Sequence, residues 1–153
     1  MNESEVLNAK ILIIDDAEAN LKLLEDLLTR EGFHQVISTA DSTRAIDLFK
    51  AFAPDLILLD LMMPDLDGYA VLEILSRHIP KDEYLPVLVL TADATIGAKR
   101  KALALGAKDF LTKPFDTIEA MLRVWNLLET RILYRHLKAV NNELRPINHP
   151  HSG

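Results

Sequence analysis

Residues 11–16 read Ile-Leu-Ile-Ile-Asp-Asp, and this stretch decides the fold class of the chain. A short apolar run that favours strand and ends in polar residues is typical of a strand buried on both faces, as in a parallel sheet. A second run, residues 56–59, leads in the same way into Asp60. The carboxyl ends of parallel strands meet at the crevice where open α/β sheets bind ligands. We therefore expect Asp15, Asp16 and Asp60 to lie together at one edge of a sheet.

Three carboxylates at one place predict a cation between them. Crowded carboxylates repel one another and raise a pKa, unless a positive ion sits among them. The pattern therefore indicates a divalent metal site. It also offers a carboxylate able to act as a nucleophile.

Two further apolar runs end in residues that suit the same site. Residues 86–90 lead into Thr91-Ala92, and residues 107–112 lead into Lys113-Pro114. A pair of metal-binding carboxylates, a nucleophile, a hydroxyl and a cation are the groups needed to hold a tetrahedral oxyanion beside a carboxylate. Phosphoryl transfer depends on such positioning and charge neutralisation more than on covalent help from the protein.

The apolar runs alternate with segments of helical periodicity, which predicts a doubly wound α/β fold with a five-stranded parallel sheet. The helix expected at 95–105 is rich in alanine and carries three cations in a row, so its inward apolar stripe is thin. We expect a helix with so few apolar contacts to move more easily than the other helices. The other helices are expected near residues 17–30, 42–53, 68–79 and 117–144.

The last expected helix is longer than a compact domain needs. No Gly or Pro interrupts residues 118–144, and the apolar positions Leu133, Leu137, Val140 and Leu144 follow at spacings of four, three and four. This spacing is typical of a short coiled-coil seam. Two interpretations stay open, a homodimerising coiled coil and a linker helix of a longer protein.

Length and composition limit the classes of protein. The chain has 153 residues, which fits one domain, and a net charge of −6 without a basic block, which disfavours binding to DNA phosphates. It has no cysteine for a disulfide or thiolate site. Neither a signal peptide nor an apolar stretch of ~20 residues is visible, so we expect a soluble cytoplasmic protein.

Four motifs stand at the strand ends. They are Ile-Ile-Asp15-Asp16, Leu-Leu-Asp60-Leu-Met-Met-Pro64-Asp-Leu-Asp67-Gly68, Leu-Thr91-Ala92 and Phe110-Leu-Thr-Lys113-Pro114-Phe115. Through these motifs, residues 9–130 resemble the response-regulator receiver domain of bacterial two-component signalling.

The resemblance divides the chain. We expect an N-terminal tail at 1–8, a helical extension and candidate coiled coil at 131–144, and a disordered tail at 145–153. The extended helix is similar to those of receivers that head multidomain regulators.

The resemblance implies a role for each residue at the strand ends. Asp60 is implied to be the phosphoacceptor, with Mg²⁺ bound by Asp60 and Asp16, by Asp15 through water, and by the backbone carbonyl of Met62. Oxygen ligands and retained waters are what Mg²⁺ prefers.

The resemblance also implies how the phosphoryl group is held and sensed. Lys113 and Thr91 are implied to contact phosphoryl oxygens, and the Lys113–Pro114 bond is expected to be cis. Phe110 is implied to swing inward behind Thr91. The signal then appears on the face made by the helix expected at 95–105, the fifth strand and the helix expected at 117–144.

The same resemblance implies partners and excludes others. A histidine kinase or phosphotransfer protein is the expected donor, and a homodimer and a fused or separate output domain are candidate partners. No direct contact with nucleic acid or membrane is expected, since nothing after Leu144 has room for a DNA-reading helix pair. The chain is expected to be no enzyme beyond its own phosphorylation and dephosphorylation.

Other classes with a similar fold fit the sequence less well. A haloacid-dehalogenase-type phosphohydrolase needs a second Asp two residues after its nucleophile, but Met62 follows Asp60 there and Ala17 follows Asp15. A flavodoxin needs a phosphate-cradling loop after the first strand, and none is present. The alternative that remains is a receiver-like interaction or dimerisation module that is not phosphorylated.

Overall fold

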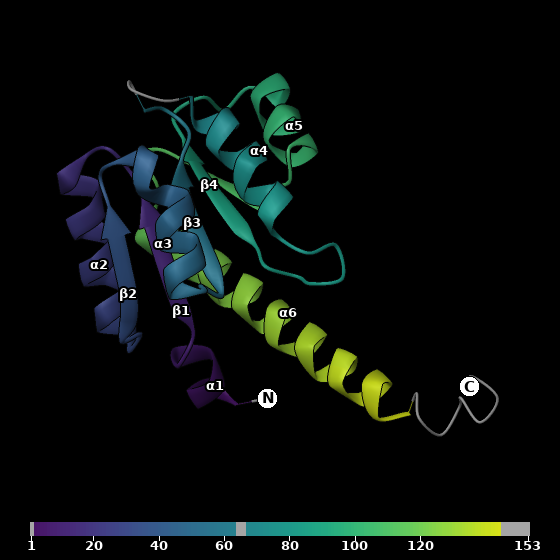
Figure 1. Cartoon of the computed structure of the whole chain (residues 1–153). Coiled ribbons are helices and arrows are strands. Elements are labelled where there is room, and N and C mark those ends of the chain that lie inside the picture. The colour runs from purple at the N-terminus through teal and green to yellow at the C-terminus, as the bar shows by residue number, and fades with distance from the viewer. Residues whose placement is uncertain (1, 64–66, 145–153) are drawn as a thin grey trace.

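A computed structural model describes residues 2–63 and 67–144. Its centre is a parallel sheet in the order β2-β1-β3-β4-β5, which confirms the predicted fold class (Figure 1). Pro64 of the second motif and the tail expected at 145–153 lie outside the described residues. The strands are β1 (Lys10–Ile14), β2 (Gln35–Thr39), β3 (Leu56–Asp60), β4 (Val87–Thr91) and β5 (Asp109–Thr112).

Helices cover both faces of this sheet, as the alternation of elements predicts. One face carries α2 and α6, and the other carries α3, α4 and α5. The helices are α1 (Glu3–Leu7), α2 (Glu18–Glu31), α3 (Ala45–Phe52), α4 (Gly68–His78), α5 (Ile96–Ala104) and α6 (Thr117–Leu144), with a short 3₁₀ turn, η1 (Ser42–Arg44).

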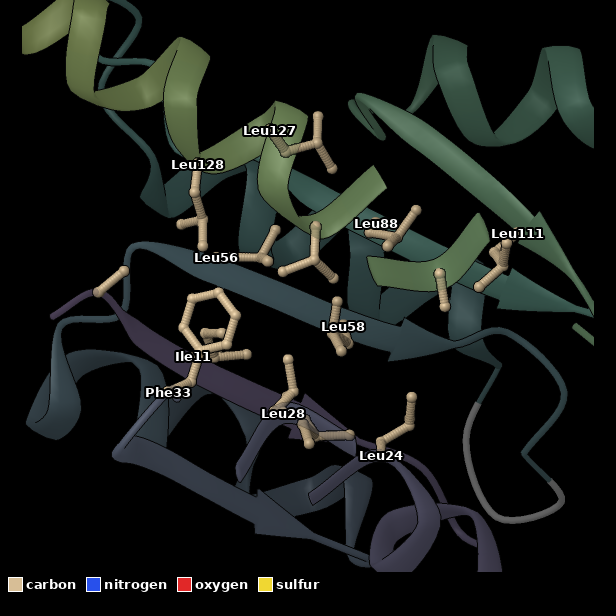
Figure 2. Close-up of a cluster of buried hydrophobic side chains, with 14 of the residues drawn as sticks. Ile11, Leu24, Leu28, Phe33, Leu56, Leu58, Leu88, Leu111, Leu127 and Leu128 are labelled. Carbon is tan, nitrogen blue, oxygen red and sulfur yellow. The ribbon is translucent and has the colours of Figure 1, made fainter. Parts of the chain in front are cut away.

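Each central strand supplies the core on both sides of the sheet. In β1, Ile11 and Ile13 point toward α2 and α6, whereas Leu12 and Ile14 point toward α3 and α4, and all four are fully buried. Figure 2 shows the core on the first side, where side chains from β1, β3, β4 and β5 meet those of α2 and α6. This double burial explains why the strands read as unbroken apolar runs.

Helix α5 is held to the body by few apolar contacts. Ala102 is the only buried residue of this helix, as its alanine-rich sequence predicts. A hydrogen bond of 2.7 Å from the Ser76 hydroxyl to the Leu105 carbonyl holds its C-terminal end against α4.

Helix α1 lies within residues 1–8, where the sequence suggests a tail. The Asn2 side chain accepts a hydrogen bond from the Glu5 amide and caps the helix, and Val6 is buried in the core beside α2 and α6. A five-residue helix is too short to show a periodic apolar pattern, so the sequence carries no signal for it. No helix in the described ranges has the length and apolarity to cross a bilayer.

Candidate phosphoacceptor and metal site

Three aspartates lie together at the carboxyl edge of the sheet. Asp15 and Asp16 follow β1 and Asp60 ends β3, and these two strands are hydrogen-bonded neighbours. One carboxylate oxygen from each aspartate lies within 4.8 Å of the others, as the sequence predicts. Asp15 and Asp60 are buried, whereas Asp16 is exposed. The cluster is therefore open to solvent on one side.

Lys113 brings the positive charge that the sequence places at the end of β5. Its Nζ lies 3.1 Å from Oδ2 of Asp15 and 3.3 Å from Oδ1 of Asp60. Its backbone N–H donates to the Thr91 carbonyl at 2.7 Å, and the bond to Pro114 is cis, as the resemblance implies. The lysine thus bridges the two buried carboxylates.

The same local turn fixes a side chain at three of the strand ends. In each, the side-chain oxygen of one residue accepts a hydrogen bond from the backbone N–H two residues later, as in Asx and ST turns. This turn orients the oxygen with no help from other elements. The three bonds, each 3.0 Å, run from the amide of Ala17 to Asp15, from that of Met62 to Asp60, and from that of Asp93 to Thr91.

The cluster carries more negative than positive charge. Burial raises the pKa of the Asp15 carboxyl, and the negative charge of Asp60 raises it further. The hydrogen bond from the Ala17 amide and the Lys113 ammonium lower this pKa, but the net shift is upward. Three carboxylates and one ammonium leave a balance of two negative charges within this site. A divalent cation with oxygen ligands matches both that charge and the donor set.

The residues expected to sense the phosphoryl group lie on β4 and β5, the two strands that follow β3 in the sheet. Thr91 is buried at the end of β4, and Phe110 is half-buried on β5, opposite Val89 in the register. The Lys99 ammonium lies 4.5 Å from the centre of the Phe110 ring. Sequence reasoning missed this cation–π contact, because nothing in the spacing of the two residues indicates that α5 crosses β5 there.

Comparison with known proteins identifies the family. Residues 11–124 match the model of the response regulator receiver domain, so the chain belongs to that family. Response regulator PleD of Caulobacter vibrioides is 38% identical over 132 residues, which are 86% of this chain and 29% of that protein.

Solved structures give the same result for the fold. The receiver domain of the Francisella response regulator 1452 is 31% identical, with a TM-score of 0.73 over 80% of this chain and 98% of that one. The BeF3-activated DrrB receiver domain is 27% identical, with a TM-score of 0.70 over the same shares. The chain spans about half or less of most curated relatives that it matches, such as 29% of PleD and 43% of the regulator ycf27 of Guillardia theta.

Proposed function

We propose that this chain accepts a phosphoryl group on Asp60 from a histidine kinase or phosphotransfer protein, in a reaction that depends on Mg²⁺. The observation that supports this most is the position of Asp60. Its buried carboxylate ends β3 with the Lys113 ammonium 3.3 Å away and two more carboxylates beside it. A cytoplasmic location, where such a kinase works, is part of the proposal.

The transfer uses one oxygen of Asp60 as the nucleophile. In the described part of the chain, the Met62 amide and the Lys113 ammonium both contact Oδ1, which leaves Oδ2 to attack phosphorus. The bond from phosphorus to the donor's imidazole nitrogen breaks, and that nitrogen keeps the electron pair and takes up a proton from solvent. The product is an acyl phosphate on Asp60, which hydrolysis later removes.

The surrounding residues neutralise the charge of the incoming group. Asp15, Asp16, Asp60 and the Met62 carbonyl would hold Mg²⁺, which when bound offsets charge on the phosphoryl oxygens. The Lys113 ammonium would exchange part of its contact with Asp60 for a phosphoryl oxygen, and the Thr91 hydroxyl would donate to another. Preorganised donors of this kind stabilise charge as it develops.

The phosphoryl group would change the surface on one side of the site. It adds about −1.5 to −2 units of charge and strong acceptor oxygens. Movement of Thr91 toward it would open space for the Phe110 ring to turn inward from β5. The face formed by α5, β5 and α6 would then present the signal to a partner, to a second copy or to a further domain.

The test is the intact mass of the protein after incubation with acetyl phosphate. We expect one phosphoryl adduct that base and hydroxylamine remove, as for an acyl phosphate, when Mg²⁺ is present, and none when the metal is chelated. Asp60→Asn removes the nucleophile and should abolish the adduct. Asp26→Asn, an exposed carboxylate on α2, is the matched control and should keep it.

The opposite result would change the assignment. If no donor modifies the parent protein while Mg²⁺ is present, Asp60 is not a phosphoacceptor, and the chain is an interaction module of receiver fold that works by binding alone.

A further inference from the structure

Helix α6 extends far beyond the sheet, yet contacts from the body hold part of this extension. Figure 1 shows α1 on one side of α6 and the loop between α4 and β4 on the other. These contacts lie at the edge of the sheet opposite the aspartate cluster, where β1 and β3 begin. They join α1, the start of β3 and the loop between α4 and β4 to residues 131–138 of α6, although these four segments are far apart in the sequence.

Asp55 forms the centre of these contacts. Its Oδ1 accepts from Nε of Arg131 at 2.9 Å, and Arg135 approaches the same oxygen at 3.4 Å. Its Oδ2 accepts from the Lys10 amide at 2.8 Å, which fixes the carboxylate to the start of β1. Arg131 also donates to the Tyr84 carbonyl at 2.8 Å. The side chains of Arg131 and Asp55 are only 11% and 19% exposed, so water screens this pair little.

Helix α1 holds α6 from the first side. Nε2 of His136 lies 3.0 Å from a carboxylate oxygen of Glu5. Val6, the next residue, is buried in the core, so α1 is itself fixed to the body. A cavity of about 450 Å³ lies beside this pair, between α1, Asp55 and α6. Polar contacts at the rim of the cavity therefore add to the apolar packing of Ile132 against the core in holding α6 there.

The loop between α4 and β4 holds α6 from the second side. Lys138 pairs with the Asp82 carboxylate at 2.9 Å, and the Tyr134 hydroxyl donates to the Asp82 carbonyl at 3.0 Å. The rings of Tyr84 and Tyr134 pack with their centres 6.3 Å apart. The Lys138 ammonium lowers the pKa of the Asp82 carboxyl, because a nearby positive charge favours its ionised form.

We propose that these three sets of contacts form a collar, defined as Glu5, Asp55 and Asp82 with Arg131, His136 and Lys138, that fixes the direction and rotation of α6 as it leaves the domain. A helix held from one side can bend away, but contacts on two sides and at the centre oppose bending and rotation. The receiver body and the extension then move as one rigid unit. The apolar stripe Leu133, Leu137, Val140 and Leu144, which is 49–64% exposed, faces away from the body. This inference goes beyond phosphorylation and does not depend on it.

The test measures the distance between the body and the end of α6. Because the chain has no cysteine, Lys50→Cys on α3 and Asn141→Cys on α6 introduce two unique spin-label sites, both exposed. Labelled protein is diluted into an excess of unlabelled protein, so that pulsed electron paramagnetic resonance reads only distances within one chain. The collar is opened by Glu5→Gln with Asp82→Asn, and in a second variant by Asp55→Asn as well. Glu73→Gln, which breaks an ion pair on α4 away from the collar, is the control.

Hydrogen exchange of residues 129–144, measured on these variants and also on Glu5→Gln alone and Asp82→Asn alone, gives a second measurement. An exposed ion pair contributes little alone, so each single change should speed exchange about two- to fivefold. A collar predicts that opening the α1 side also speeds exchange next to the loop side and beyond residue 138. An isolated ion pair would affect only its own turn.

The two outcomes are distinct. We expect one narrow distance distribution in the parent and in Glu73→Gln, and a broader one in both opened variants, whether or not Asp60 accepts a phosphoryl group. A parent distribution as broad as that of the opened variants would overturn the proposal. So would opened variants that keep the narrow distribution and show exchange changes confined to single turns.

Discussion

At the scale of the residue, burial of the Asp15 carboxyl group makes the stability of the folded protein depend on pH. This carboxyl group is fully buried beside Asp60, and burial raises its pKa from the ordinary value of 3.8. The folded state therefore holds a proton on Asp15 more tightly than the unfolded state does. Stability contributed by this group is present at low pH, falls as the pH rises through the window between the two pKa values, and stays low at neutral pH.

Removing the Asp15 charge should therefore stabilise the metal-free protein. We expect Asp15→Asn to raise Tm at pH 7 by a few degrees without Mg²⁺, and to gain little at low pH, where the parent carboxyl is protonated. Calorimetry across this pH range, with chelator and then with Mg²⁺, measures the effect. Saturating Mg²⁺ should remove the advantage, because it offsets the same charge.

The control for this prediction is Asp26→Asn, which changes an exposed carboxylate and should leave Tm within about one degree at every pH. A lower Tm for Asp15→Asn at pH 7 in chelator would mean that the pair with Lys113 outweighs burial and the repulsion from Asp60.

At the scale of the element, Gly68 lets α4 begin close to the site. A Cβ at this position would lie 2.4 Å from the Leu61 Cα and 2.5 Å from its carbonyl oxygen, and Leu61 directly follows Asp60. Backbone atoms cannot move aside as a flexible side chain can. The contact between the α4 N-terminus and the chain after β3 is therefore possible only without a side chain.

Gly68→Ala should destabilise the fold and disturb the chain next to Asp60. We expect a loss of about 2 kcal/mol or more in denaturant unfolding, within the range of overpacked sites, and slower adduct formation. Gly97→Ala is the matched control, because a Cβ there meets nothing within 4 Å and alanine favours a helix by roughly 1 kcal/mol over glycine. Equal effects of the two changes would contradict the steric argument.

At the scale of the whole molecule, the exposed stripe of α6 favours a second copy of the chain as its partner. Leu133, Leu137, Val140 and Leu144 keep the coiled-coil spacing in the folded helix and remain exposed there. So few heptads give a marginal dimer, unless the face formed by α5, β5 and α6 adds to the contact. We therefore expect a weak, concentration-dependent dimer that phosphorylation strengthens.

Leu137→Lys should weaken this dimer without unfolding the chain, because the side chain is 64% exposed. Sedimentation analysis with and without phosphodonor measures the change, and we expect at least a tenfold rise in Kd, which corresponds to about 1.4 kcal/mol. Asn142→Lys, on the opposite side of the helix, should leave Kd unchanged. A parent that stays monomeric at all concentrations in both states would exclude the dimer.

Sequence reasoning succeeds for elements whose signal is local. The apolar runs predict strands buried on both faces, and the long run without Gly or Pro predicts α6, because both patterns depend only on neighbouring residues. Helix α1 escapes this reasoning because it is too short for a period. The contact of Lys99 with Phe110 escapes it because a cation–π pair between two elements leaves no pattern in either.

The sequence by itself determined the fold class, the three strand-end aspartates and the residues that accompany them. Each of these polar residues follows directly, in the sequence, the apolar run that forms its strand. Only the tertiary structure decided which of these groups touch. Lys113 meets Asp15 across 98 positions of sequence, and His136 meets Glu5 across 131. Such contacts follow from the order of the strands and from the packing of α6 on the body. Periodicity describes how one element buries its own face, and it does not specify which distant side chain lies against that face.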